Sequence, residues 1–158
     1  GVVVEIVTPG TGNPVPFGEV GEVLVTTLNF DYPLIRFATG DLSAFMEGSS
    51  PCGRSNLRIK GWMGRADQTT KIKGMFVRPE QVAAFVSKYP EVTRARVIAS
   101  RAAEADVMTV KIEGDIGRAD IYAASIVEIL KLRAKVEMVA TGELPKDGII
   151  IEDQRSYD

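Results

Sequence analysis

The chain contains no histidine and a single cysteine among its 158 residues. Without histidine, the chain by itself offers no Ser-His-Asp triad, no histidine general base and no histidine-ligated metal. One cysteine excludes an internal disulfide and a multi-cysteine metal site. Cys52 would need a base other than histidine to act as a nucleophile, and we expect it to lie in a loop without special reactivity. The sequence therefore predicts no metal site.

Strong charge and long apolar runs are also missing. The formal net charge is −2, which gives no reason to expect nucleic acid or an anionic membrane surface as a partner. No apolar run reaches the roughly 18–20 residues that span a bilayer. The first residues lack the basic region and cleavage pattern of a signal peptide. We therefore expect a cytoplasmic protein, and the absence of an initiator Met predicts that the chain is a fragment of a longer one.

The first part of the sequence is typical of a small antiparallel sheet. β-branched and alternating segments alternate with turns that are rich in glycine and proline. Strands are expected at residues 2–7, 22–28, 34–37 and 42–46, with the last two flanking a turn at Thr39-Gly40-Asp41. We interpret residues 1–66 as an incomplete β-rich domain that is completed by chain not present here.

The second part, residues 67–158, alternates between strand and helix patterns. A short strand is expected at 69–73 and a helix begins at Pro79, whose missing N–H is tolerated in a first turn. The expected apolar stripes are Val82, Phe85, Val86 and Tyr89 for this helix and Tyr122, Ile126, Ile129 and Leu130 for a second helix. Further strands are expected at 94–100, 108–113 and 135–138. The resulting order, βαββαβ, predicts an α+β fold with a ferredoxin-like second domain.

Two polar motifs lie near the junction of these parts. Thr39-Gly40-Asp41 presents a carboxylate, and Gly64-Arg65-Ala66-Asp67 presents a guanidinium. A carboxylate accepts hydrogen bonds from sugar hydroxyls, and a guanidinium donates several to oxygens. Each motif alone is typical of an ordinary polar turn. Together, Asp41 and Arg65 predict a clamp for a hydroxylated, phosphorylated ligand.

The residues around these motifs resemble the adenylate-forming enzymes. Phe37–Asp41 resembles their Tyr-x-Thr-Gly-Asp motif, with Phe37 lacking the tyrosine hydroxyl, and Gly64–Asp67 resembles their hinge motif. Gly18–Val23 resembles another motif of these enzymes, Gly-Glu-x-Gly-Glu. Three further segments look most like the phenylacetate–coenzyme A ligase branch: Pro33–Arg36, Cys52–Arg54 and Lys73–Pro79. The resemblance runs from about Glu19 to about Pro145 and implies the C-terminal portion of such a ligase.

The resemblance implies a role for each of several residues. Asp41 would bind the ribose hydroxyls of ATP or of the acyl-adenylate, and Arg65 would reach the ribose or phosphate side of that nucleotide. Trp62 would pack on the ribose or adenine, the alternative being a plain core aromatic. Asp67 would be the hinge before a mobile C-terminal domain, the alternative being a helix or strand cap. Gly74 would lie in a loop that approaches the pantetheine arm of coenzyme A, the alternative being a solvated edge strand guarded by lysines.

The C-terminal region departs from the family pattern. Relatives carry a catalytic lysine in a Gly-Lys element after a Leu-Pro-Arg-like segment, where it neutralises charge as the carboxylate attacks the α-phosphate. The matching region here, Gly142–Glu152, lacks that element, and Lys146 is the remaining lysine. The alternatives are that Lys146 fills the role, that the enzyme is altered, that it uses only the second half-reaction, or that adenylation has been lost.

Two hypotheses about function remain open at this point. The first is an ATP-dependent acyl– or aryl–coenzyme A ligase that uses ATP with Mg²⁺, coenzyme A and a small carboxylic acid, for which the branch suggests an aromatic acid. Because the phosphate-binding loop and the acid pocket are not in this chain, we expect the fragment alone to be inactive. The second is a ligand-binding or regulatory ferredoxin-like module. Exposed sheet edges allow copies to pair, so the oligomeric state is left open.

Overall fold

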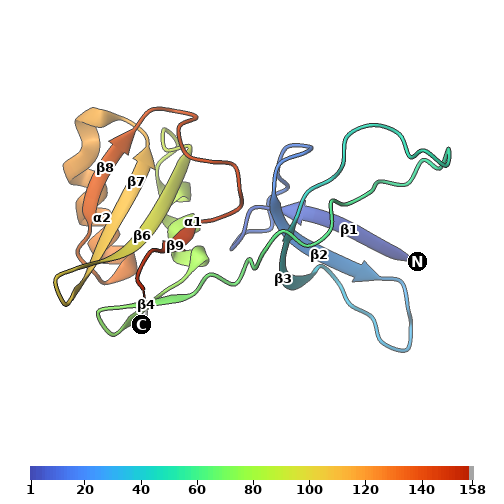
Figure 1. Cartoon of the computed structure of the whole chain (residues 1–158), viewed down its shortest axis with the longest axis horizontal. Helices are drawn as coiled ribbons and strands as arrows, with labels where there is room; N and C mark the ends of the chain where they lie inside the picture. Colours follow the sequence, from blue (N-terminus) through green and yellow to red (C-terminus); the bar gives the residue numbers. More distant parts are fainter. Residues whose placement is uncertain (157–158) are drawn as a thin grey trace. The chain divides into compact units, whose positions relative to one another are not determined.

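The computed structural model describes residues 1–156, which fall into two compact units (Figure 1). Unit 1 comprises Gly1–Asp67 together with Lys146–Gly148, and unit 2 comprises Gln68–Pro145 and the residues from Ile149 onward. No helix in the described residues is long and apolar enough to cross a membrane.

Unit 1 contains a three-stranded antiparallel sheet in the order β1-β2-β3. Its strands are β1 (Val2–Val7), β2 (Gly21–Thr27) and β3 (Phe37–Ser43). β1 and β2 pair without interruption, from Val2 opposite Thr27 to Val7 opposite Glu22. Residues on both faces of this sheet are buried, because successive side chains of a strand point to opposite faces. The neighbours Ile6 and Val7 of β1 are both buried, as are the neighbours Val23 and Leu24 of β2.

The Thr39-Gly40-Asp41 segment lies within a strand, so the expected turn between two strands is wrong. β3 runs through this segment, but its register against β2 shifts between Glu22, which faces Leu42, and Leu24, which faces Ala38. The segment therefore bulges out opposite a single β2 residue, Val23. The Thr39 hydroxyl secures the bulge, because it donates to the Val23 carbonyl (3.0 Å) and accepts from the Asp41 N–H (3.2 Å).

Unit 2 is built on a four-stranded mixed sheet in the order β8-β7-β6-β9. Its strands are β6 (Arg94–Ala102), β7 (Ala105–Glu113), β8 (Lys135–Val139) and β9 (Ile151–Asp153). β6 and β7 are antiparallel, whereas β8 is parallel to β7 and β9 is parallel to β6. A two-stranded hairpin, β4 (Thr70–Ile72) and β5 (Met75–Val77), forms a separate sheet.

Two helices cover one face of this sheet (Figure 1). They are α1 (Pro79–Lys88) and α2 (Ala119–Leu130), the latter preceded by a short 3₁₀ helix, η1 (Ile116–Arg118). Phe85 of α1 and Tyr122 of α2 meet edge to face, with ring centroids 5.9 Å apart, above buried residues of β6 and β7. Both apolar stripes predicted from the sequence therefore form the core.

The predicted α+β class is confirmed, but several strands of unit 2 differ from those expected. The expected first strand of the second domain, residues 69–73, pairs with β5 in the separate hairpin instead of entering the sheet. β9, which no sequence pattern predicted, takes the edge position beside β6. Its three residues are too few to show a strand periodicity, and its place is set by tertiary pairing.

Candidate functional site

Asp41 and Arg65 are brought together by the backbone of unit 1. The segment that carries Arg65 runs antiparallel to β3, with Asp41 and Arg65 as directly opposed partners. Backbone hydrogen bonds on both sides fix this register: the Leu42 N–H donates to the Gly64 carbonyl (2.9 Å) and the Ala66 N–H donates to the Gly40 carbonyl (2.8 Å). The opposed positions place the two side chains on the same face.

The side chains of Asp41, Arg65 and Trp62 meet at one oxygen atom. Asp41 Oδ1 accepts hydrogen bonds from Arg65 Nη1 at 2.9 Å and from Trp62 Nε1 at 3.2 Å. Both of these contacts use the same carboxylate oxygen, and a carboxylate offers about four lone-pair sites, so Asp41 retains capacity for hydroxyl donors of a ligand.

Gly40 makes this arrangement possible. Its φ is +75°, a conformation that side chains other than glycine rarely adopt. A Cβ at this position would stand 2.6 Å from Arg65 Nη2, so the guanidinium lies directly over the glycine. The Thr-Gly-Asp motif thus combines three functions: Thr39 closes the bulge, Gly40 admits the guanidinium, and Asp41 receives it.

The cluster is open to solvent. Trp62 is 71% exposed, so its ring is not part of the core of unit 1. The side chains of Asp41 and Arg65 are 39% and 55% exposed. The exposed indole offers an apolar face, the carboxylate accepts hydrogen bonds from hydroxyl groups, and the guanidinium donates hydrogen bonds to oxygens. A nucleotide has the matching groups, namely a flat base, ribose hydroxyls and phosphate oxygens.

Asp67 is the last residue of unit 1 before the chain enters unit 2. Its side chain is exposed and makes no hydrogen bond or ion pair within residues 1–156, so it does not cap a helix or strand there. The next residue, Gln68, is fixed within unit 2, since its Oε1 accepts from the backbone N–H of Ile150 (2.6 Å) and Ile151 (3.0 Å). Nothing in the sequence singled out Gln68.

Gly74 lies in the turn of the β4–β5 hairpin. Lys73 (φ 48°) and Gly74 (φ 82°) are its two loop residues, and positive φ at both is the pattern of a type I′ turn. A Cβ on Gly74 would meet nothing within 4 Å. Phe76, on β5, is 54% exposed between two cations, with Lys71 Nζ 5.7 Å and Arg78 Cζ 5.8 Å from its ring centre.

Lys146 lies in the irregular segment between β8 and β9 and is exposed. Its side chain makes no hydrogen bond or ion pair within the described part of the chain. The residues just before it are anchored to unit 2 by Glu113, whose Oε1 accepts from the Leu144 N–H (2.9 Å) and whose Oε2 accepts from the Thr93 hydroxyl (2.9 Å). Burial opposes ionisation of Glu113, but the hydrogen bonds from Leu144, Gly142 and Thr93 outweigh it and lower the pKa of this carboxyl.

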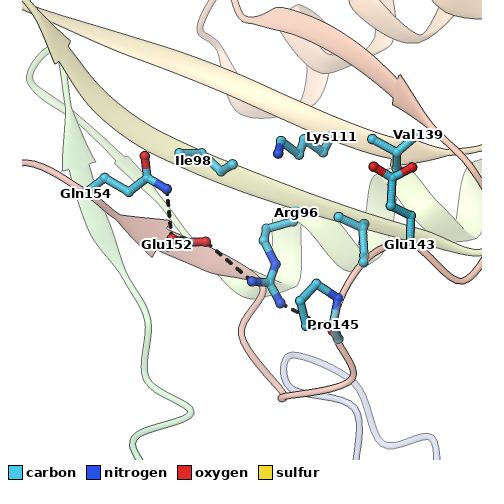
Figure 2. A pocket seen from close by; sticks show the side chains of 9 residues that line it. Arg96, Ile98, Lys111, Val139, Glu143, Pro145, Glu152 and Gln154 are labelled. Atoms are coloured by element: carbon cyan, nitrogen blue, oxygen red, sulfur yellow. Dashed lines mark hydrogen bonds and ion pairs between the residues drawn. The ribbon is translucent and has the colours of Figure 1, made fainter.

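Arg96 provides a second anchor on the sheet face opposite the helices (Figure 2). Its side chain is 8% exposed, and its guanidinium contacts Glu152 Oε2 (3.4 Å) and the Pro145 carbonyl (3.3 Å). A pocket of about 270 Å³ opens beside it, lined from β6, β7, β8, β9 and the loop before Pro145. Lys111 and Glu143 also line this pocket. The two cations, Arg96 and Lys111, balance the two carboxylates of Glu143 and Glu152, so the pocket favours neither an anionic nor a cationic ligand.

The sequence did not identify Glu113 or Arg96 as important residues. The alternation predicted for residues 108–113 placed Glu113 on the polar face of its strand, whereas Arg96 was predicted only to lie in a strand. Neither pattern indicated that a loop would cover these side chains. Their burial depends on the return of residues 140–146 across the strand ends, which is a tertiary event.

Within residues 1–156, no three His, Cys, Asp or Glu side chains gather to hold a metal ion. Cys52 is exposed in a loop, with its sulfur 3.0 Å from the Ser50 hydroxyl. That contact, followed by the backbone at Arg54, lowers the pKa of the Cys52 thiol.

Comparison with solved structures shows which class of fold this is. The chain matches a crystal structure of 2-hydroxyisobutyryl-CoA ligase in complex with 2-HIB-AMP and CoA, with a TM-score of 0.51 and 24% identity over 98% of this chain and 36% of that one. It also matches a domain of phenylacetate-coenzyme A ligase from Bacteroides vulgatus, with a TM-score of 0.52 and 23% identity over 57% of this chain and 95% of that one. At this level of identity, the matches show that the fold is that of acyl-CoA ligase C-terminal domains.

Comparison of sequences narrows the class to a family. No protein-family model matches the chain. A phenylacetate-coenzyme A ligase from Thermus thermophilus is 37% identical over 111 residues, which cover 69% of this chain and 25% of that protein. The chain belongs to the adenylate-forming enzymes, in their phenylacetate–coenzyme A ligase branch, and corresponds to a C-terminal portion of them. It spans about a quarter of the length of the curated relatives it matches.

Proposed function

We propose that this chain forms one side of the nucleotide site of an ATP-dependent acyl– or aryl–coenzyme A ligase. The observation that carries the proposal is the meeting of Asp41, Arg65 and Trp62, three side chains that are exposed together on a backbone shaped for them. A plain structural turn needs neither the bulge nor the glycine that admits a guanidinium.

The reaction has two steps. A carboxylate oxygen of the acid attacks the α-phosphorus of ATP, the bond to the bridging oxygen breaks, and pyrophosphate leaves. The thiol of coenzyme A gives its proton to water and attacks the carbonyl carbon of the acyl-adenylate, the bond from that carbon to the phosphate oxygen breaks, and AMP leaves. In both steps Asp41 accepts hydrogen bonds from the ribose hydroxyls, Arg65 donates to the ribose or phosphate oxygens, and Trp62 packs against the ribose or the base.

Two further parts of the chain complete the assignment. We assign to Asp67 the hinge between a larger nucleotide-binding domain, to which residues 1–66 belong, and a small mobile domain, residues 67–158. We assign to Gly74 the approach to the pantetheine arm of coenzyme A, because the turn leaves its Cα open to solvent.

The substrates follow from the same assignment. The acid is a small carboxylic acid, and aromatic acids are the first to test because the relatives are named phenylacetate-coenzyme A ligases. Mg²⁺ would accompany ATP and neutralise part of its phosphate charge. We place the protein in the cytoplasm, where both ATP and coenzyme A are found.

We further propose that the 158 residues alone do not form a thioester. They span about a quarter of the relatives' length, and unit 1 exposes large apolar side chains that a complete domain would cover, including Phe30, Tyr32, Ile35 and Phe37.

A second candidate function is favoured by one observation. The Gly-Lys element of the relatives is missing, and Lys146 is the lysine that remains near its place. A homologue that has lost adenylation, or a module that binds an adenylate without acting on it, would retain Asp41 and Arg65 and dispense with that lysine.

Separate assays of the two half-reactions in the natural full-length protein test these proposals. We expect pyrophosphate release with ATP and an aromatic acid, and thioester formation from a preformed acyl-adenylate. Lys146→Ala should slow the first by about 10²–10³-fold, the usual effect of removing a charge-stabilising group, and leave the second unchanged. Lys60→Ala, which removes an exposed lysine of unit 1, is the control.

The outcomes separate the candidates. Thioester formation without pyrophosphate release supports the homologue that has lost adenylation. Adenylation that survives Lys146→Ala shows that Lys146 does not have the role assigned to it. A protein that performs neither half-reaction with any acid overturns the ligase proposal.

A further inference from the structure

The tip of the β4–β5 hairpin is held by a side chain from another strand pair. The N–H of a first loop residue has no partner within a two-residue hairpin, since the turn's own bond joins the flanking positions. In this hairpin, the Lys73 N–H donates to Asp106 Oδ2 at 3.0 Å. Asp106 is the second residue of β7, directly after the β6–β7 turn. The hairpin that carries Gly74 is therefore tied to the main sheet through one carboxylate.

Arg155 holds that carboxylate in place. Its Nη1 lies 3.0 Å from Asp106 Oδ2, the same oxygen that accepts the Lys73 N–H. Its Nε and Nη2 donate to the two oxygens of Asp153 at 2.8 and 2.7 Å. The Arg155 side chain is 4% exposed, so these charge-assisted bonds are shielded from water.

The segment that carries Arg155 is itself fixed. β9 pairs with β6 as far as Asp153, which faces Ala99, and the Gln154 N–H then donates to the Ala99 carbonyl at 2.8 Å. The Arg155 N–H donates to Asp153 Oδ1 at 3.1 Å. The backbone around Arg155 is therefore anchored on the sheet, and the Arg155 side chain extends from there to Asp106.

The charges in this network persist over a wide pH range. The hydrogen bond from the Lys73 backbone and the nearby guanidiniums of Arg155 and Arg101 outweigh burial and lower the pKa of Asp106. The carboxylates of Asp153 and Asp106 raise the pKa of Arg155. Near neutral pH the ionised, fully bonded form is the stable one.

We propose that Asp106 and Arg155 are positioning residues that hold the Lys73-Gly74 turn in the conformation that receives coenzyme A. The inference rests on the proposed ligase function for its consequence and on the contacts above for its geometry. Neither side chain touches the substrate in this assignment. They act through the backbone of the turn and add to the tether that its two flanking strands provide.

Amide hydrogen exchange of the 158-residue chain tests the geometric part. We expect Asp106→Ala to speed exchange of the Lys73 amide at least tenfold, while the amides of β6 and β7 keep their protection. Asp106→Asn retains an oxygen acceptor and should restore part of the protection. Lys88→Ala, which removes a cation from the exposed Lys88–Glu128 pair (3.0 Å), is the matched control. An unchanged Lys73 amide in Asp106→Ala overturns the proposal.

The half-reactions of the natural full-length protein test the consequence. Asp106→Ala and Arg155→Ala should raise the KM for coenzyme A about 5- to 30-fold and leave pyrophosphate release within twofold of wild type. A merely structural role would lower both half-reactions together, by reducing the folded fraction, and that result contradicts positioning. If the wild-type protein forms no thioester from acyl-adenylate, the ligase function fails, while the exchange data still decide whether Asp106 holds the turn.

Discussion

Gly40 has the most demanding role at the scale of single residues. Its positive φ closes the bulge of β3, and its missing Cβ leaves room for the Arg65 guanidinium. Gly53 has the same φ of 75°, but a Cβ there would meet nothing within 4 Å. Both glycines therefore need the same positive φ, but only Gly40 of the two has a neighbour, the Arg65 guanidinium, that a Cβ would displace.

This pair predicts unequal costs of substitution. Gly53→Ala should destabilise unit 1 by about 1–2 kcal/mol, the usual cost of a left-handed conformation. Gly40→Ala should cost more, because the new Cβ would also displace the guanidinium. Urea unfolding monitored by the fluorescence of Trp62, the single tryptophan of the chain, measures both. Equal losses would mean that the Arg65 contact over Gly40 contributes nothing.

Glu113 predicts a pH dependence at the same scale. Its folded-state pKa is lowered below the ordinary value of 4.5, so the carboxylate contributes stability above about pH 4.5, and this contribution is lost as the pH falls through the lower folded value. Glu113→Gln keeps an oxygen acceptor but cannot titrate. The free energy of unfolding of wild type relative to Glu113→Gln should therefore fall as the pH drops below about 4.5. A constant difference between pH 7 and pH 3 would contradict the assignment of this carboxylate as the anchor of residues 142–144.

At the scale of elements, one substitution in the β4–β5 turn can keep the backbone conformation and still block the approach of coenzyme A. Asparagine adopts positive φ readily and is common in type I′ turns, so Gly74→Asn should leave the free energy of unfolding within about 0.5 kcal/mol, as most exposed substitutions do. Its side chain would nevertheless occupy the open space beside the turn, and we expect the KM for coenzyme A to rise several-fold. Gly53→Asn is the control for an exposed positive-φ glycine elsewhere. An unchanged KM would show that coenzyme A does not approach the backbone at Gly74.

The elements also show how far the sequence alone could lead. Helix α1 follows directly from Pro79, its apolar stripe and Pro90, and it ends at Lys88 as local rules require. The opposition of Asp41 and Arg65 was predicted from motif chemistry, but the motif is a bulged strand and not a turn. That difference was not predictable, because a bulge is defined by the register against β2, which lies far away in the sequence.

The anchors in unit 2 were beyond sequence reasoning for the same reason. Asp106, Arg155 and Glu113 resemble ordinary surface charges in the sequence. Some of their partners, such as Arg155 for Asp106 and the Leu144 N–H for Glu113, arrive from the segments that flank β9 when these return to the sheet. Local periodicity reports which face a residue occupies and not what later covers that face.

At the scale of the whole molecule, the chain forms two compact units, and each carries residues of one proposed site. Unit 1 carries Asp41, Arg65 and Trp62, and unit 2 carries the hairpin with Gly74. The chain matches about a quarter of the length of its phenylacetate-coenzyme A ligase relative, so the two units correspond to part of that longer protein. A ligase of the proposed kind must bind a nucleotide on unit 1 before unit 2 can contribute to the reaction.

The affinity of the natural full-length protein for AMP, measured by calorimetry, is therefore the most direct test. We predict that Asp41→Ala weakens binding by about 10- to 100-fold, since hydrogen bonds to a charged group contribute about 1.5–3 kcal/mol and 1.4 kcal/mol corresponds to a tenfold change. Asp31→Ala, which removes an exposed carboxylate of the same unit, should bind AMP like wild type. An affinity that Asp41→Ala leaves unchanged would contradict the account.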